Sequence, residues 1–378
     1  MTIQALKTYS ILNAKNVVGW RTDRKIVVFS VDDYGNVRVD SKAARQRMNQ
    51  HGLKVYNRFD AYDTLETRED IEVLFETLMS VTDSNGRNAV FTPFAVPCNI
   101  NFEKMAANGY QKYEYELLPQ TFSKLSSQQP EAYDGAWELI QEGITEKIFL
   151  PQFHGREHLN LKIFEEKLAS NDNEILTALK NRSYTSISAK NYETITPSAA
   201  FEFWDVKEND RFKDVICDGL RAFKDVFGYP AVHFNPPGGR EHPVIHKALY
   251  DNGIKYLDTP LLKNEHQGKG DYRTVFNYTG KQNTWGQIYL VRNVVFEPTD
   301  DRGLDWVGYA MKQIETAFRW NRPAIISSHR VNFCGHIDEQ NRAIGITALQ
   351  ELLDRIIARW PEVEFLSANE LGETIEVT

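Results

Sequence analysis

The sequence has few of the features that mark several large protein classes. It contains 3 cysteines in 378 residues, and Cys98, Cys217 and Cys334 form no C-x-x-C pair. An odd number of widely spaced cysteines makes no disulfide framework, so a reducing compartment is the simpler expectation. No apolar run is long enough to span a bilayer, and residues 1–20 lack the apolar core of a signal peptide. The sequence therefore predicts a cytoplasmic protein.

An excess of positive charge is also missing. The formal net charge is -8, so the chain offers no basic surface of the kind that binds nucleic acid. It contains no Walker or dinucleotide-binding glycine pattern, no internal repeat and no low-complexity segment. Hydrophobic content of 42% and charged content of 25% are ordinary for a globular chain. These observations exclude nucleic acid as the expected partner and leave the oligomeric state open.

Apolar runs typical of buried strands alternate with helical patterns along the chain. We expect strands over residues 25–35, 88–96, 148–153, 231–234, 254–257, 288–296, 323–328 and 363–366. Between them we expect helices over residues 41–51, 68–79, 161–168, 212–227, 243–252, 305–318 and 339–358. Such alternation indicates parallel strands wrapped by helices, in either a barrel or a doubly wound sheet. We interpret 1–378 as a single domain of this kind, with insertions at about 97–147, 170–210 and 264–287.

Four of the predicted strands end in clusters of polar residues, namely Asp32–Asp33, His154 with His158, Asn235–Arg240 and His329. In a (β/α) barrel the carboxyl ends of the strands form one face, which carries the active site. Segments that lie far apart in the sequence would then meet at one mouth. The convergence of these clusters is the main indication of function in the residues themselves.

Two of the clusters together contain the ligands of a metal site. His154 and His158 are four positions apart, so on a helical turn they would lie on one face. Two imidazoles with a nearby carboxylate suit zinc or a similar divalent ion, and three protein ligands leave a position open for water. A histidine pair at this spacing also fits a hydrogen-bonded surface turn. Paired aspartates after a strand likewise fit a helix cap or an Asx-turn.

The paired aspartates raise a geometric difficulty. Adjacent residues of a strand point to opposite faces, so Asp32 and Asp33 cannot both reach one site from a regular strand. We therefore predict that the strand ends or bulges at Val31.

The letters HGREH at residues 154–158 also match H-x-x-E-H, a metalloprotease signature in which the glutamate, here Glu157, is the general base. That signature needs a continuous helix, whereas this segment follows an apolar strand and contains Gly155. The peptidase interpretation also leaves the paired aspartates and His329 without a role. It is kept as an alternative.

Five motifs in this order resemble the polysaccharide deacetylase family, also called the NodB or carbohydrate esterase type 4 group. They are Ser30–Gly35, with the paired aspartates, then His154–His158, Asn235–Gly239, Asp301 with Asp305–Trp306, and Ser328–His329. The resemblance extends from about residue 25 to residue 370. Tyr34, after the aspartates, is similar to the D-D-x-G pattern of YdjC-type deacetylases.

The resemblance implies a distorted (β/α) barrel of seven or eight units and a metal-dependent hydrolase. Its substrate would be a saccharide or an amino-sugar precursor, losing an N-acetyl group in preference to an O-acetyl group, by cleavage of a C–N bond other than a peptide bond. Asp33, His154 and His158 would hold one divalent ion, with Zn²⁺ favoured over Co²⁺, Ni²⁺, Fe²⁺ or Mn²⁺. Asp32 would be the general base and His329 the general acid.

The resemblance also implies substrate contacts by Tyr34, Asn235, Pro237, Arg240, Trp306 and Arg330, with the Tyr34 backbone N–H near the oxyanion. Two positions depart from the family pattern. Asn235 stands where the family has an arginine that steadies the base, and Arg330 stands where it has an acidic residue. Arg240 or Arg330 would have to replace that arginine. These departures keep a second hypothesis open, a catalytically inactive carbohydrate-binding barrel.

Overall fold

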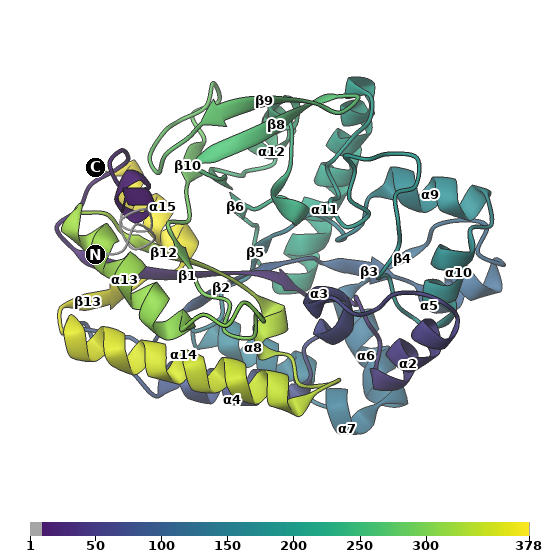
Figure 1. The fold of residues 1–378 in the computed structure, drawn as a ribbon, viewed down its shortest axis with the longest axis horizontal. Helices are drawn as coiled ribbons and strands as arrows, with labels where there is room; N and C mark the ends of the chain where they lie inside the picture. The colour runs from purple at the N-terminus through teal and green to yellow at the C-terminus, as the bar shows by residue number, and fades with distance from the viewer. Residues whose placement is uncertain (1–9, 378) are drawn as a thin grey trace.

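The computed structural model describes residues 10–377, and one large curled parallel sheet lies at the centre of this part of the chain (Figure 1). Its strand order is β10-β7-β6-β5-β2-β1-β12-β11, and β13 also pairs with β1. Every pairing within this sheet is parallel. The strands are β1 (Lys25–Tyr34), β2 (Phe91–Ala95), β5 (Gln152–Phe153), β6 (His233–Phe234), β7 (Tyr256–Asp258), β10 (Ile288–Leu290), β11 (Val294–Val295), β12 (Ala324–His329) and β13 (Val363–Phe365).

Strand β1 occupies the middle of the sheet because its residues are apolar on both faces. All of its residues except Lys25 are buried. A continuous apolar run is what a parallel strand requires when other elements cover both of its faces. On one side β1 pairs with β12, and on the other side its two halves pair with β13 and β2.

The two ends of the strand order are joined by a very short connection. Strands β10 and β11 stand at opposite ends of that order, yet only residues 291–293 separate them. Four residue steps of extended chain span roughly 14 Å at most. The sheet must therefore curl until its edges approach each other. The expected α/β barrel of distorted form is confirmed, whereas the single strand expected over 288–296 is wrong.

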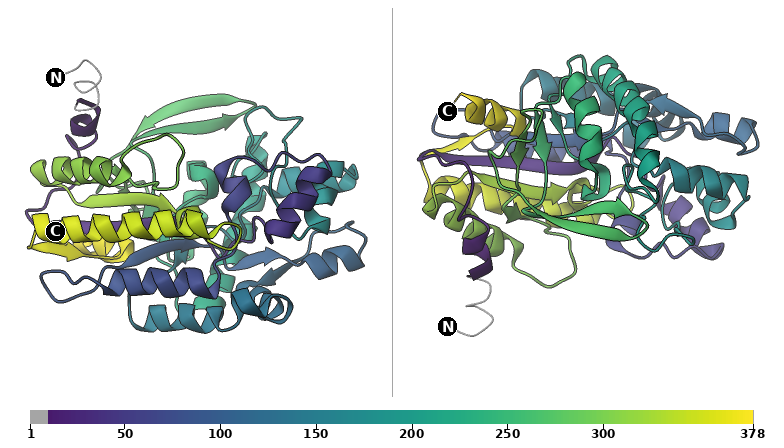
Figure 2. Two further views of the ribbon diagram at one scale, coloured as in Figure 1. Left: turned by 60° about the horizontal axis from the view of Figure 1, so that its bottom comes forward. Right: turned by 90° about the horizontal axis from the view of Figure 1, so that it is seen from above.

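Helices surround the sheet (Figure 2). They are α2 (Lys42–Gln50), α3 (Arg58–Tyr62), α4 (Arg68–Met79), α5 (Phe102–Ala107), α6 (Leu118–Gln128), α7 (Pro130–Tyr133), α8 (Ala136–Thr145), α9 (Leu161–Ala169), α10 (Asn173–Lys180), α11 (Asn209–Phe227), α12 (His246–Asp251), α13 (Trp306–Arg319), α14 (Glu339–Arg359) and α15 (Ala368–Glu376). Short 3-10 turns are η1 (Val206–Glu208), η2 (Pro237–Gly239), η3 (Pro243–Ile245) and η4 (Arg330–Phe333). Among residues 10–377, no helix combines the length and the apolar character needed to cross a membrane.

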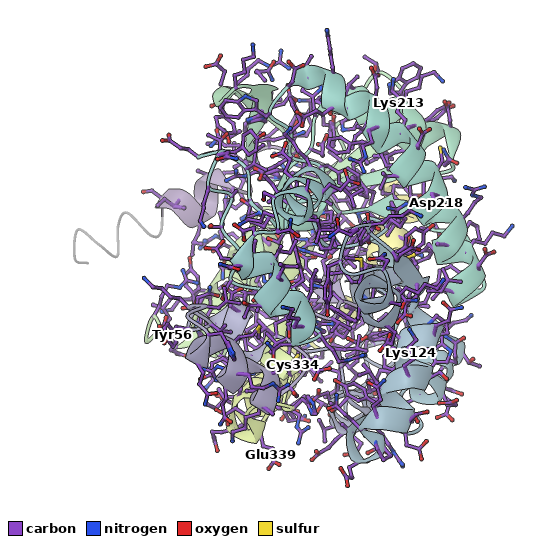
Figure 3. The ribbon with its side chains drawn as sticks, turned by 90° about the vertical axis from the view of Figure 1, so that its right-hand side faces the viewer. Tyr56, Lys124, Lys213, Asp218, Cys334 and Glu339 are labelled. Carbon is purple, nitrogen blue, oxygen red and sulfur yellow. The ribbon has the colours of Figure 1, made fainter. Side chains whose placement is uncertain are left out.

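The expected insertions contain more regular structure than the sequence indicated. Residues 97–147 contain an antiparallel pair of strands, β3 (Cys98–Ile100) and β4 (Tyr115–Leu117), with α5 between them. Helices follow β4, and of these α8 packs on α4. Residues 262–276 form a second hairpin, β8 (Leu262–Gly268) with β9 (Asp271–Phe276). Figure 3 shows the molecule from the side on which α11, with Lys213 and Asp218, and α6, with Lys124, are labelled. Helices α10 and α15 were not expected.

Helix α14 packs closely on η4, the turn that follows β12, through its Gly345. A Cβ atom at Gly345 would lie 1.7 Å from the backbone carbonyl oxygen of Asn332, which cannot rotate away. We predict that Gly345→Ala lowers the free energy of unfolding by about 3 kcal/mol, because overpacking displaces backbone. Thr347→Ala on the exposed face of the same helix is the control and should change it little. Denaturant titration of both variants measures the difference, and equal stability would contradict the contact.

Candidate metal centre

A bulge at the end of β1 directs both aspartates to the same mouth of the barrel. The register between β1 and β2 shifts between Val31 and Tyr34, and Asp33 has φ of 78°. A left-handed residue breaks the alternation of a strand, so consecutive side chains no longer point to opposite faces. The predicted bulge at Val31 is confirmed. A left-handed conformation costs free energy for a residue other than glycine, and strained residues of this kind often occur at functional sites.

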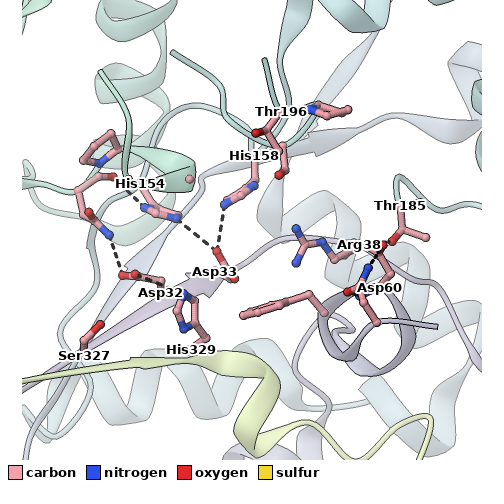
Figure 4. Close-up of a pocket in the computed structure, with 18 of the residues that line it drawn as sticks. Asp32, Asp33, Arg38, Asp60, His154, His158, Thr185, Thr196, Ser327 and His329 are labelled. Atoms are coloured by element: carbon pink, nitrogen blue, oxygen red, sulfur yellow. Dashed lines mark hydrogen bonds and ion pairs between the residues drawn. The ribbon is translucent and has the colours of Figure 1, made fainter. Parts of the chain in front are cut away.

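Asp33, His154 and His158 form one compact buried group (Figure 4). The Oδ1 atom of Asp33 lies 3.0 Å from Nε2 of His158 and 3.4 Å from Nε2 of His154. Within residues 10–377, this is the only group of three or more such side chains whose ligand atoms lie close enough together for one metal ion. Asp33 and His154 are 121 positions apart in the sequence. They lie close together because β1 pairs with β2, and β2 pairs with β5, the strand that ends just before His154.

The hydrogen bonding of His154 leaves one ring nitrogen available for a cation. Its Nδ1 lies 2.8 Å from the carbonyl oxygen of Asn235, which can only accept, so Nδ1 carries the hydrogen. Its Nε2 is buried without a hydrogen-bond partner among the described residues and faces Asp33. A histidine fixed in this way by a backbone carbonyl is the usual arrangement of a metal ligand. The residues present therefore fit a divalent ion.

The protonation states of the group also suit a cation. Burial raises the pKa of Asp33, but His158 and His154 outweigh it and hold that pKa well below its usual range. Burial lowers the pKa of His158 and outweighs the carboxylate of Asp33. At neutral pH the group thus presents a carboxylate and a neutral imidazole, the forms in which these side chains bind metals.

The segment that carries the two histidines is not helical. Residues 156–159 form bends, none of residues 154–160 is helical, and Gly155 has φ of 86°. Glu157 is buried and bound by Arg156, with Nε 2.5 Å and Nη2 3.0 Å from its oxygens, and it does not line the cavity. The expected helical turn is wrong, and H-x-x-E-H lacks the helix and the free glutamate that a peptidase of that kind requires.

Asp32 is held by an arginine that the sequence analysis did not identify. Arg292 donates from Nη1 to Oδ2 and from Nη2 to Oδ1 of Asp32, both at 2.7 Å. Asn235 donates from Nδ2 to Oδ1, also at 2.7 Å. Asp258 orients Arg292 in turn, because its Oδ2 accepts from Nε of Arg292 at 2.8 Å. The Oδ1 of Asp258 lies 3.0 Å from Nε2 of His233. Arg240 pairs with Glu202 and Arg330 with Asp63 and Glu66, so the guanidinium that binds Asp32 is that of Arg292.

Arg292 was missed because residues 288–296 were expected to form one strand. In the structure Arg292 lies in the connection that crosses between the two edges of the sheet, at residues 291–293. Only the closed barrel brings it over the ends of β1 and β7. The only sign of Arg292 in the sequence was a charged residue within an otherwise largely apolar predicted strand.

His329 lies at the same mouth, paired in register with Asp32. Its Nε2 is 3.9 Å from Oδ2 of Asp32, and its Nδ1 is 2.6 Å from Oε1 of Glu297. Burial lowers the pKa of His329, but the carboxylate of Glu297 outweighs it and raises the pKa to about 9. Arg58 in turn holds Glu297 through an ion pair of 2.6 Å. His329 is therefore a cation at neutral pH and can give up a proton.

A cavity of about 690 Å³ opens over this group. The two aspartates, the two histidines, Asn235 and His329 line it, together with Arg292 and Asp258. Its outer wall comes from segments around Phe59, Thr185 and Pro197. The five residues predicted to hold the metal or to move protons therefore share one cavity.

Most of the residues predicted to contact the substrate lie elsewhere. Of the six, only Asn235 lines the cavity. The other five do not line it: Tyr34, Pro237, Arg240, Trp306 and Arg330. Tyr34 packs its ring edge-on against Phe149, and Arg240 pairs with Glu202. Trp306 is buried behind Asp305, which caps α13.

Arg330 is one of the largest fully buried side chains and binds two carboxylates away from the cavity. It donates to Asp63 at 2.8 and 3.0 Å and to Glu66 at 2.9 Å. Glu66 also accepts from the backbone N–H of Gly35 at 3.1 Å. The cation after the strand-end histidine thus ties the start of the β1–α2 connection to the loop before α4.

No protein-family model matches the chain, and no curated protein matches it in sequence. Solved structures do resemble it. A protein of Mycobacterium smegmatis that is provisionally called a polysaccharide deacetylase shares 12% identity, covering 95% of this chain and 93% of its own, with a TM-score of 0.48. An allantoinase shares 10% identity over 95% and 93%, with a TM-score of 0.47. A family 4 acetyl xylan esterase of Clostridium thermocellum, in complex with cobalt, shares 10% over 92% and 91%, with a TM-score of 0.33.

These structural neighbours include polysaccharide deacetylases, the family that the sequence motifs resemble. At such identities a likeness concerns the course of the backbone and assigns no activity to this chain.

We predict that Asp33→Ala abolishes tight binding of one Zn²⁺ or Co²⁺ per chain. The variant removes the only charged ligand and leaves two imidazoles, so affinity should fall by a factor of about 100 or more. Isothermal titration of the metal-free protein measures it, and added metal should raise the Tm of the wild type alone. Asp60→Asn, on the outer wall of the cavity, is the control. Full metal occupancy in Asp33→Ala would remove this residue from the ligand set.

Proposed function

We propose that the chain is a metal-dependent hydrolase that removes an acetyl group from a saccharide or an amino-sugar precursor. The observation that carries the proposal is the single cavity in which a three-ligand site, an oriented carboxylate and a protonated imidazole stand together. A general base and a general acid with separate environments are what hydrolysis of an acyl bond requires.

Each residue then has a distinct task. Asp33, His154 and His158 hold the ion, for which we propose Zn²⁺ because two imidazoles and one carboxylate suit it. A divalent ion held by these residues would supply a Lewis acid that polarises a carbonyl group and lowers the pKa of water. Asp32, fixed by Arg292 and Asn235, accepts a proton from the attacking water. Its carboxylate cannot rotate away, since both oxygens are bound by the same guanidinium.

His329 supports an N-acetyl group as the one removed. An amine leaves readily only after it has received a proton, and His329 carries one at neutral pH because Glu297 raises its pKa. The edge of the Phe59 ring packs on the imidazole with centroids 5.0 Å apart, which further fixes the orientation of His329. The cleaved bond would be a C–N bond other than a peptide bond.

The hypothesis of an inactive carbohydrate-binding barrel loses its main support. It depended on the absence of the family arginine at Asn235 and on the unusual Arg330. Arg292 supplies the guanidinium to Asp32 from another segment, and Arg330 lies outside the cavity. Both departures are therefore compatible with a working site.

We predict that Asp32→Asn retains the metal and loses acetate release from N-acetylated saccharides. An amide cannot accept the proton, so kcat should fall by a factor of about 100 to 10,000. Metal analysis and an acetate assay on a panel of N-acetyl and O-acetyl saccharides measure the two properties separately. An unchanged rate would remove Asp32 from the mechanism, and a wild type inactive on the whole panel would contradict the proposed function.

We predict that Glu297→Gln moves the alkaline limit of activity to lower pH. His329 must be protonated to act as an acid, so activity falls as pH rises through its pKa, which is about 9 in the native site. Loss of the Glu297 charge removes the largest effect that raises this pKa, while Asp33 and Asp32 still raise it and burial lowers it, so the pKa should fall by about 1 to 3 units. The pH profile of kcat measures the shift. Glu364→Gln, whose ion pair with Arg24 is remote from the cavity, is the control.

A further inference from the structure

Arg38 is a cation of the cavity wall that the proposed mechanism does not use. It follows β1, and 12% of its side-chain surface is exposed. Figure 4 shows its guanidinium beside Asp33 and His158, on the side away from Asp32. The ring of Phe59 lies beneath it, with the guanidinium carbon 5.5 Å from the ring centroid. The stacked ring limits the movement of the guanidinium and keeps its edge toward the cavity.

The protein occupies little of the hydrogen-bonding capacity of Arg38. Among the described residues, its side chain makes one hydrogen bond, from Nη1 to Oδ2 of Asp63 at a long 3.4 Å. The other oxygen of Asp63 already accepts two shorter hydrogen bonds from Arg330. A guanidinium has five N–H groups, so most of those of Arg38 remain for a ligand or for water.

The other charged groups of the cavity are committed to protein partners or to the metal. Arg292 binds Asp32 and Asp258, and Asp33 belongs to the metal group. The carboxylate of Asp60 accepts from the hydroxyls of Thr185 at 2.6 Å and Ser186 at 3.1 Å. His329 is paired with Glu297. Arg38 is thus the cation of the cavity with donors to spare.

We propose that Arg38 forms a subsite for an oxyanion, a carboxylate or a phosphate, on the sugar whose acetyl group is removed. This subsite rests on the proposed function and narrows its substrate class to acidic acylated sugars. A planar guanidinium matches the two oxygens of a carboxylate or phosphate in a bidentate pair. The position beside the metal group places the anionic substituent on the same sugar residue as the acetyl group, or on its neighbour.

The test compares three sugars on the zinc-loaded full chain, namely neutral N-acetylglucosamine, N-acetylmuramic acid with a carboxylate, and N-acetylglucosamine 6-phosphate. The wild type should favour one anionic sugar over the neutral one in kcat/KM. Arg38→Gln should reduce that preference by a factor of about 10 to 100, since hydrogen bonds to charged groups contribute most where they are desolvated. The preferred anionic sugar distinguishes a carboxylate from a phosphate.

Two further variants separate the subsite from a structural or long-range role. Lys54→Gln removes an exposed positive charge on the segment whose backbone binds Ser186, and it should leave the preference intact. Arg38→Lys keeps the charge without the fork and should retain part of the preference. If Arg38→Gln does not fold, Arg38→Lys decides the question by the same ratio.

Binding to the zinc-loaded Asp32→Asn chain, measured by isothermal titration, keeps this test independent of turnover. An anionic preference in binding that Arg38→Gln removes supports the subsite even if no sugar releases acetate, an outcome that would contradict the proposed function alone. Equal binding of neutral and anionic sugars by the parent chain overturns the subsite. So does a loss in Arg38→Gln that is the same for all three sugars, which is what a structural role would produce.

Discussion

The ion pair between Arg292 and Asp32 joins the closure of the barrel to its chemistry. Arg292 lies in the three-residue connection between the two edges of the sheet, and it reaches β1 and β7 at once through Asp32 and Asp258. Removing one partner from such a buried group leaves a charge unpaired, which typically costs about 3 to 5 kcal/mol. The shape of the sheet and the orientation of Asp32 therefore depend on the same contacts.

Around this pair, each charged side chain at the mouth of the barrel has its own partners. His158 and His154 hold the pKa of Asp33 well below its usual range, a guanidinium binds both oxygens of Asp32, and Glu297 raises the pKa of His329 to about 9. Two adjacent carboxylates can share one mouth because each has its own partners, Arg292 for Asp32 and the two histidines for Asp33, and the bulge at Asp33 directs both side chains there. The left-handed conformation of Asp33 thus gives the two carboxylates separate sets of partners.

The sequence carried enough information for the strands that end in the site. The apolar run before Asp32, and the short runs before His154 and His329, indicated parallel strands whose carboxyl ends meet, and the structure has them. The bulge followed from one rule, that adjacent strand residues point to opposite faces. Substrate contacts were harder, because Trp306 and Arg330 are buried for structural reasons that a motif does not reveal.

By itself, the sequence determined the α/β class, because the period of the apolar residues is a local property. The set Asp33, His154 and His158 came from the resemblance to deacetylases, and the structure brings these three side chains together. Only the tertiary structure showed that residues 291–293 cross from one sheet edge to the other, that Arg292 steadies Asp32, and that Arg38 faces the cavity with donors to spare. These are long-range pairings, set by how the sheet curls and by which buried charges find partners. A linear pattern does not encode either one.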